Sequence, residues 1–126
     1  MNKTIINTPS APAPLGPYSQ AVVAGGLLFI SGQIPMEPAT GTIVSGDITG
    51  ETRQVMNNLR AILEQAGRSF SDVVKTTIYL SDMSLFAAVN EEYGKYFQSE
   101  YPARETVAVK ELPRSIRVEI SMIATA

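Results

Sequence analysis

The chain has 126 residues, of which 44% are apolar and 17% charged, a composition typical of one packed globular domain. Ten basic and twelve acidic residues give a net charge of −2, and no basic run occurs, so nucleic-acid binding is not favoured. The absence of cysteine and histidine excludes disulfides, thiolate nucleophiles, imidazole bases and Cys/His metal sites.

The N-terminal segment does not resemble a signal peptide or a membrane span. In residues 1–17, Ile5 and Ile6 are the only adjacent apolar pair, whereas a signal peptide needs an apolar core of roughly 7–15 residues. The longest apolar run, residues 21–30, contains two glycines and is shorter than the about 20 residues of a membrane span. We therefore expect a cytoplasmic protein.

The first half of the chain predicts a strand, a hairpin and a helix. Four prolines in residues 8–17 indicate a loop after the first strand. In AVVAGGLLFISG, two apolar runs flank Gly25-Gly26, which is typical of a two-residue hairpin turn. Residues 49–66 follow a turn-rich loop and predict a helix with Asp47 or Thr49 as its cap, because apolar side chains recur on one face: Val55, Leu59, Ile62, Leu63 and Ala66.

The second half predicts a strand over residues 73–81 and a helix capped by Asp82 or Ser84, with an apolar stripe of Phe86, Val89, Tyr93 and Phe97. RETVAV and SIRVEISMIATA then read as two strands, which we expect to form an antiparallel hairpin. The whole chain predicts one α+β domain, residues 1–126, with two helices on one face of a single sheet of about six strands. The other sheet face would stay apolar, and a partner subunit is its most economical cover.

Arg104 and Glu119 are the first candidates for a site. Strand alternation places Arg104 and Thr106 on one face of their strand and Glu105 on the other. In the expected hairpin, Arg104 would lie near Glu119. This pair is either a cross-strand salt bridge, which contributes little when exposed, or a cation that binds a carboxylate or phosphate beside an acid–base carboxylate.

Four further residues are weaker candidates. Asn90 falls on the expected buried stripe of the second helix, as a core amide bonded to local backbone or as a ligand contact. Tyr18 follows the proline-rich arm, and Ser31-Gly32 follows a strand, where glycine would allow a ligand to approach the backbone. The sequence contains no P-loop, GxGxxG, GxSxG or HExxH motif.

Five segments together resemble the RidA/YjgF family of reactive-intermediate deaminases. They are GPYSQAV, ISGQIP, TRQVMNNLRAILEQAG, VVKTTIYLSDMSLFAAVNEEY and YPARETVAVKELPRSIRVEI, and the resemblance runs from about residue 5 to the last strand. Its most specific part is Pro-Ala-Arg followed at a fixed distance by Leu-Pro and then Val-Glu-Ile.

The resemblance implies a chorismate-mutase-like α+β fold that assembles as a homotrimer, with the sheets forming a central barrel and three clefts between subunits. It also implies hydrolysis of 2-aminoacrylate and related enamines or imines to 2-keto acids and ammonium, without a metal or cofactor. By this resemblance Arg104 binds the substrate carboxylate and Glu119 places the attacking water, while the other cleft positions are Tyr18, Ser31, Gly32, Asn90 and Thr106.

Two residues depart from the pattern of the family. Glu105 stands where a small or apolar residue is expected, and by alternation it points away from the cleft. Thr106 stands where many members have cysteine, so we expect it to contribute through its backbone and to shift substrate preference.

Other functions remain open at this point. The same trimer would serve as a non-catalytic binder or sensor of small 2-keto or amino acids, for which Arg104 is needed and Glu119 is not. Nucleic-acid cleavage, an activity attributed to some members of the family, is disfavoured by the net charge, and a structural role is not excluded.

Overall fold

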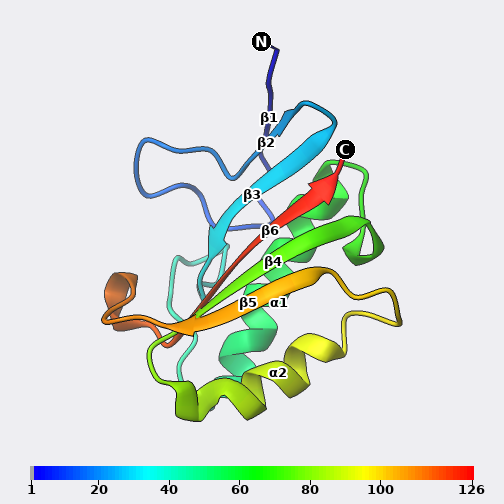
Figure 1. Ribbon diagram of the computed structural model, residues 1–126. Coiled ribbons are helices and arrows are strands. Elements are labelled where there is room, and N and C mark those ends of the chain that lie inside the picture. The colour runs from blue at the N-terminus through cyan, green and yellow to red at the C-terminus, as the bar shows by residue number, and fades with distance from the viewer. Residues whose placement is uncertain (1) are drawn as a thin grey trace.

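The computed structural model describes residues 2–126, which form one six-stranded sheet with two α-helices on one of its faces (Figure 1). This is the predicted α+β architecture. Among the described residues, we find no helix with the length and apolar character that a membrane crossing requires. In chain order the elements are β1 (Thr4–Ile6), β2 (Ala21–Ala24), β3 (Leu27–Gln33), α1 (Ile48–Gln65), β4 (Val73–Leu80), α2 (Phe86–Gly94), β5 (Ala103–Ala108) and β6 (Val118–Thr125).

Local signals in the sequence set most of the element boundaries. The Asp47 carboxylate accepts a hydrogen bond of 2.8 Å from the Gly50 N–H and so caps α1. Asp82 caps in the same way, but it begins a 3₁₀ turn, and α2 starts only at Phe86. The predicted hairpin is confirmed, because Gly25 and Gly26 have φ angles of 60° and 79° and join β2 directly to β3.

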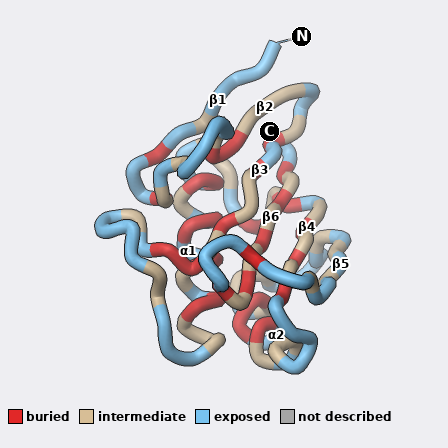
Figure 2. The backbone as a smooth tube through the Cα atoms, turned by 90° about the vertical axis from the view of Figure 1, so that its left-hand side faces the viewer, coloured by how far each residue is buried: buried red, intermediate tan, exposed pale blue. Residues whose placement is uncertain are grey.

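The expected hairpin between the last two strands is wrong. The sheet order is β1-β2-β3-β6-β4-β5, so β4 separates β5 from β6. β5 pairs with β4 in parallel, and β6 pairs antiparallel with both β3 and β4. Burial explains this order: alternate residues of β6 are completely buried, which suits a central strand, whereas β5 is exposed along most of its length and forms the edge (Figure 2).

The two faces of the sheet have different surroundings. The face toward the helices carries the apolar core, to which α1 contributes Val55, Leu59, Ile62 and Leu63. The opposite face, here called the open face, carries Glu119 on β6. Phe29 on β3 and Val107 on β5 also lie on this face, and each is 43% exposed. The open face is therefore partly apolar and is not covered within the chain.

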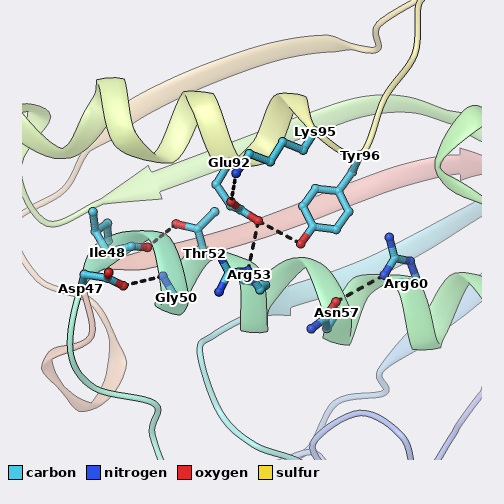
Figure 3. Close-up of polar contacts among 10 residues, drawn as sticks. All are labelled: Asp47, Ile48, Gly50, Thr52, Arg53, Asn57, Arg60, Glu92, Lys95 and Tyr96. Atoms are coloured by element: carbon cyan, nitrogen blue, oxygen red, sulfur yellow. Dashed lines mark hydrogen bonds and ion pairs between the residues drawn. The ribbon is translucent and has the colours of Figure 1, made fainter.

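A buried carboxylate joins the two helices. Glu92 of α2 is only 3% exposed, and its carboxylate meets Arg53 of α1 at 3.5 Å and Lys95 at 3.0 Å (Figure 3). The hydroxyl of Tyr96 donates a third contact of 3.2 Å to the same carboxylate. Glu92 thus fixes the position of α2 against α1, and α2 in turn carries part of the candidate site.

Candidate active site

Arg104 lies on the helix side of β5, next to Thr76 of β4. Its guanidinium carbon is 5.1 Å from the ring centre of Tyr93 and 5.8 Å from that of Phe86, both on α2. The Tyr93 hydroxyl donates to the Thr76 hydroxyl at 3.0 Å, which fixes this ring. Within residues 2–126 no carboxylate lies within 4.0 Å of the Arg104 guanidinium. The two rings hold the cation in place and leave its N–H donors available.

A pocket of about 490 Å³ opens beside Arg104. Asn90 lines it and is exposed, so the expectation that this amide is buried is wrong. The side of α2 that carries Asn90 faces this pocket and not the core, which takes Val89 instead. The full lining consists of Asn90, Tyr93, Gly94, Tyr101, Pro102 and Arg104.

Glu119 lies on the open face, near the beginning of β6 and opposite Tyr79 of β4. Its carboxyl is partly buried, and burial raises its pKa above the usual value of a glutamate. Gly32 lies directly against it: a Cβ at residue 32 would be 2.9 Å from the carboxylate carbon. Any side chain at residue 32 would displace the Glu119 carboxylate, so a glycine is needed for the backbone of β3 to lie this close to Glu119.

Ser31 holds the end of the proline-rich arm against β3. The Ser31 hydroxyl donates to the Ser19 carbonyl at 2.6 Å, and the Ser31 N–H donates to the Gln20 carbonyl at 2.9 Å. These bonds hold the segment that begins with Tyr18 beside Ser31 and Gly32. Tyr18 itself is 52% exposed, and its hydroxyl accepts a hydrogen bond from the Leu15 N–H.

Gln20 is a positioning residue that sequence reasoning missed. Its buried side-chain amide donates to the carbonyls of Thr8 and Pro12 at 3.0 and 2.9 Å, and its oxygen accepts from the Thr8 N–H at 2.7 Å. It thereby fastens the arm to β2. A lone glutamine before an apolar run has no sequence pattern that reveals such a role. Phe86 and Tyr93 were predicted only as core residues, although they also support Arg104.

The structure separates the two principal candidates. Arg104 lies on the helix face with Thr76, whereas Glu119 lies on the open face with Tyr79. The expectation that they meet across a hairpin is wrong, and so is the alternative of a salt bridge between them. Since the sheet stands between the two side chains, one chain alone does not present both to the same small ligand.

Comparison with known proteins assigns the chain to a family. A family model described as Endoribonuclease L-PSP matches residues 8–126. A RutC family protein from Pyrococcus horikoshii is 55% identical over 97% of both chains. A 2-iminobutanoate/2-iminopropanoate deaminase from Dermatophagoides farinae is 47% identical over 96% of this chain and 94% of its own. The structure of a Rid family protein from Yersinia pestis is 45% identical, with a TM-score of 0.97 over 99% of this chain and 100% of the other. The chain belongs to the RidA/YjgF family.

The two departures from the RidA/YjgF pattern lie on opposite faces of β5. Glu105 points to the open face, opposite to Arg104 as alternation predicts, where it forms an ion pair of 3.3 Å with Lys75 and accepts a hydrogen bond of 3.0 Å from Thr77. Thr106 pairs with Ile78 on the helix side, and its hydroxyl is buried without a hydrogen-bond partner. Glu105 therefore does not contact Arg104, whereas Thr106 shares its face.

No group of three or more acidic side chains that could hold a metal ion occurs within residues 2–126. The candidate residues offer one guanidinium on the helix side of the sheet and one carboxylate of raised pKa on the open face, together with amide and hydroxyl groups.

Proposed function

We propose that this chain is a hydrolytic deaminase that converts 2-aminoacrylate and related enamines and imines to 2-keto acids and ammonium. The proposal is supported by membership of the RidA/YjgF family and by relatives that carry the name 2-iminobutanoate/2-iminopropanoate deaminase. The observation that carries it is the Arg104 guanidinium, held over two rings at a pocket without a carboxylate partner in the described chain. Such a cation suits the carboxylate of a small 2-imino acid.

Arg104 acts first, as the anchor. Two parallel N–H···O bonds from its guanidinium fix the substrate carboxylate in position and in orientation. This places C2, the carbon that reacts, at a defined distance from the attacking water, which lowers the barrier through orientation. Asn90 lines the same pocket and offers an amide to the polar atoms of the substrate.

The chemistry itself is the addition of water and the loss of ammonia. A proton added to the methylene carbon of 2-aminoacrylate gives the 2-iminopropanoate iminium ion. Water attacks C2 and gives a proton to the Glu119 carboxylate. Glu119 returns that proton to the nitrogen, the C2–N bond breaks, and the C2 hydroxyl gives its own proton to the departing ammonia, so that pyruvate and ammonium remain. A raised pKa makes Glu119 a better base than an ordinary carboxylate near neutral pH.

We further propose that the active unit is a homotrimer with one site in each cleft between subunits. The separation of Arg104 and Glu119 by the sheet, together with the exposed Phe29 and Val107 on the open face, supports this assembly. One subunit supplies Arg104, Asn90 and Thr106 to a site, and its neighbour supplies Tyr18, Ser31, Gly32 and Glu119. We place this enzyme in the cytoplasm, where it removes reactive metabolites.

The first test couples a serine dehydratase, which releases 2-aminoacrylate, to the purified protein and follows the rate of pyruvate formation. We expect the native chain to accelerate pyruvate release and both Arg104→Ala and Glu119→Ala to lose the acceleration. If the native chain gives no acceleration, or Glu119→Ala retains all of it, the mechanism is wrong.

A mixing experiment tests whether the site is shared. Arg104→Ala and Glu119→Ala subunits are unfolded together, refolded at equal ratio, and assayed beside each variant refolded alone. If each site takes Arg104 from one subunit and Glu119 from the next, random mixing restores about a quarter of native activity. Sites built within single chains would stay inactive in the mixture.

A non-catalytic binder of small 2-keto or amino acids is the alternative supported by the same Arg104 pocket. Calorimetric titration with pyruvate, together with the coupled assay, separates the binder from the deaminase. Arg104→Ala should lose pyruvate binding in both cases, whereas a loss of turnover in Glu119→Ala is expected only for a deaminase. RNA cleavage, the activity in the description of the family model, is disfavoured by the net charge of −2. RNA binding by the purified protein that weakens steeply with added salt would favour it.

A further inference from the structure

Gly94, the last residue of α2, lines the pocket next to Arg104. Residues three and four apart lie on the same side of a helix, so Phe86, Asn90, Tyr93 and Gly94 share the side of α2 that faces the site. Phe86 and Tyr93 support Arg104, Asn90 offers an amide to the pocket, and Gly94 contributes no side chain. At residue 94, therefore, no side chain projects from α2 into the pocket.

Neither the backbone nor its neighbours require a glycine at this position. The φ angle of Gly94 is not in the left-handed region, unlike that of Gly67 at +73° after α1. A Cβ built on Gly94 would have no side chain or backbone from outside its own stretch of helix within 4 Å, whereas a Cβ on Gly32 would collide with Glu119. Glycine within a helix is less stable than alanine. The empty space, and not the conformation, is thus the property that Gly94 provides.

The part of the pocket that one chain supplies extends past Arg104 and Asn90 along Gly94, where no side chain limits it. The remaining walls include the rings of Tyr93 and Pro102, and that of Tyr101, which is 64% exposed. These rings offer apolar surface to a substrate side chain that extends beyond Arg104 and Asn90.

We propose that Gly94 determines substrate specificity by leaving room for the substrate side chain. The site then takes 2-imino acids with longer, unbranched apolar side chains, such as the imine of norleucine, in preference to the imine of alanine. This inference rests on the proposed function, because it assumes that Arg104 binds the carboxylate of an imino acid.

The test compares two imines in one assay. An L-amino-acid oxidase with catalase produces the imines of alanine and norleucine, and semicarbazide traps them as semicarbazones. Added protein hydrolyses part of each imine before it is trapped, and the resulting decrease in semicarbazone gives kcat/KM for that imine. Native protein is compared with Gly94→Ala and Gly94→Leu. The matched control is Ala87→Leu, which adds the same side chain to an exposed position of α2 outside the pocket.

For native protein we expect a higher kcat/KM on the norleucine imine than on the alanine imine, since each buried methylene favours binding by about fourfold. Gly94→Leu should lower the value for norleucine at least about tenfold more than it lowers the value for alanine. Gly94→Ala should raise Tm, because alanine favours the helix. A lower kcat/KM of this variant on the norleucine imine would therefore not result from unfolding. Ala87→Leu should change neither imine.

Two results overturn the inference: equal effects of Gly94→Leu on both imines, or no effect on either. The same loss of preference in Ala87→Leu would also overturn it, because the effect would not come from the pocket. The proposed function fails separately, if Arg104→Ala leaves the hydrolysis of both imines unchanged.

Discussion

At the scale of single residues, Arg104 is the clearest candidate for binding a ligand in the pocket. Cation–π contact with Tyr93 and Phe86 positions the guanidinium and leaves its hydrogen-bond donors free. An arginine that is oriented by rings and not by a carboxylate offers a planar pair of donors to an incoming ligand. Lysine at this position would keep the charge but lose both the stacking and the paired donors.

We therefore expect Arg104→Lys to raise KM at least about tenfold, because one bidentate contact is replaced by a single donor. kcat should fall less, since the substrate that does bind still meets Glu119. Steady-state kinetics with 2-iminobutanoate measure this, and circular dichroism checks the fold. A KM equal to that of the native chain would show that Arg104 does not bind the substrate.

Glu119 gives a second prediction, through pH. Because burial raises its pKa, kcat/KM should decline on the acidic side at a higher pH than for an ordinary glutamate, as the carboxylate takes up a proton. Glu119→Gln should lose most activity and this acidic decline with it. An unchanged pH profile in the variant would assign the decline to another group.

The same shift affects stability. A raised pKa in the folded state means that the native protein binds the proton more tightly than the unfolded chain, so stability falls as pH rises from the unfolded to the folded pKa. Glu119→Gln should thus have a higher Tm than the native protein at neutral pH. The exposed Glu64→Gln on α1 is the matched control, and we expect no comparable gain. Calorimetry at several pH values measures both.

For single residues, the sequence indicates which side chains are candidates for the site but not where these side chains lie relative to one another. Arg104 and Glu119 stand in segments that resemble the family, so the sequence predicts both as site residues, and their roles stay predictions. The sequence does not predict their relative position, because strand alternation fixes the face of a residue within its own strand but not which strand lies next to it. The prediction that Asn90 is buried was wrong because α2 is short. Its few apolar residues do not show which side of the helix faces the pocket and which side faces the core.

Among the secondary-structure elements, the contact between α1 and α2 connects the core to the site. Glu92 lies at the centre of that contact with Arg53, Lys95 and Tyr96 around it (Figure 3). On another side of α2 are Asn90 and Tyr93. A shift of the helix would move both of these and, through Tyr93, the Arg104 guanidinium.

We expect Glu92→Ala to cost about 2 kcal/mol of unfolding free energy, since it leaves the Tyr96 hydroxyl without its acceptor and creates a cavity. Lys95→Met should cost less than about 1 kcal/mol, because this cation is mostly exposed. Urea unfolding measures the difference between the two variants. Equal values would mean that the cluster does not depend on the buried carboxylate.

The boundaries of α1 were predictable and the strand order was not, for physical reasons that differ. Asp47 and the apolar period of α1 are local signals, so the sequence around them is sufficient. The position of β6 between β3 and β4 depends on burial on both sides of the strand, which contacts from distant parts of the chain provide. The loop through Pro113 was read as a hairpin turn, although it carries the chain past the end of β4.

For the whole molecule, the open face is the surface that remains to be covered. Phe29 and Val107 expose apolar area there, and Glu105 and Lys75 pair beside them. The trimer expected from the family resemblance stays a prediction, because a single chain is described. A chain of this size gains burial from such association.

Phe29→Asp should therefore dissociate the trimer without unfolding the subunit, because Phe29 is already partly exposed in the single chain. Sedimentation velocity should show a monomer, and deaminase activity should disappear although Arg104 and Glu119 are unchanged. The exposed Met83→Asp, in the 3₁₀ turn that precedes α2, is the control away from the open face. A Phe29→Asp variant that remains trimeric would place the interface elsewhere.

The placement of Arg104 and Glu119 on opposite sides of the sheet has a consequence for mixtures of native and defective chains. If each chain serves two clefts, one through each side, then a chain that lacks both residues disables two of the three clefts in any trimer it joins. A cell that makes equal amounts of native and doubly defective chains would lose well over half of its activity. Such chains would remove more activity than their own share, whereas chains that do not fold, and so never enter a trimer, would remove only their own share.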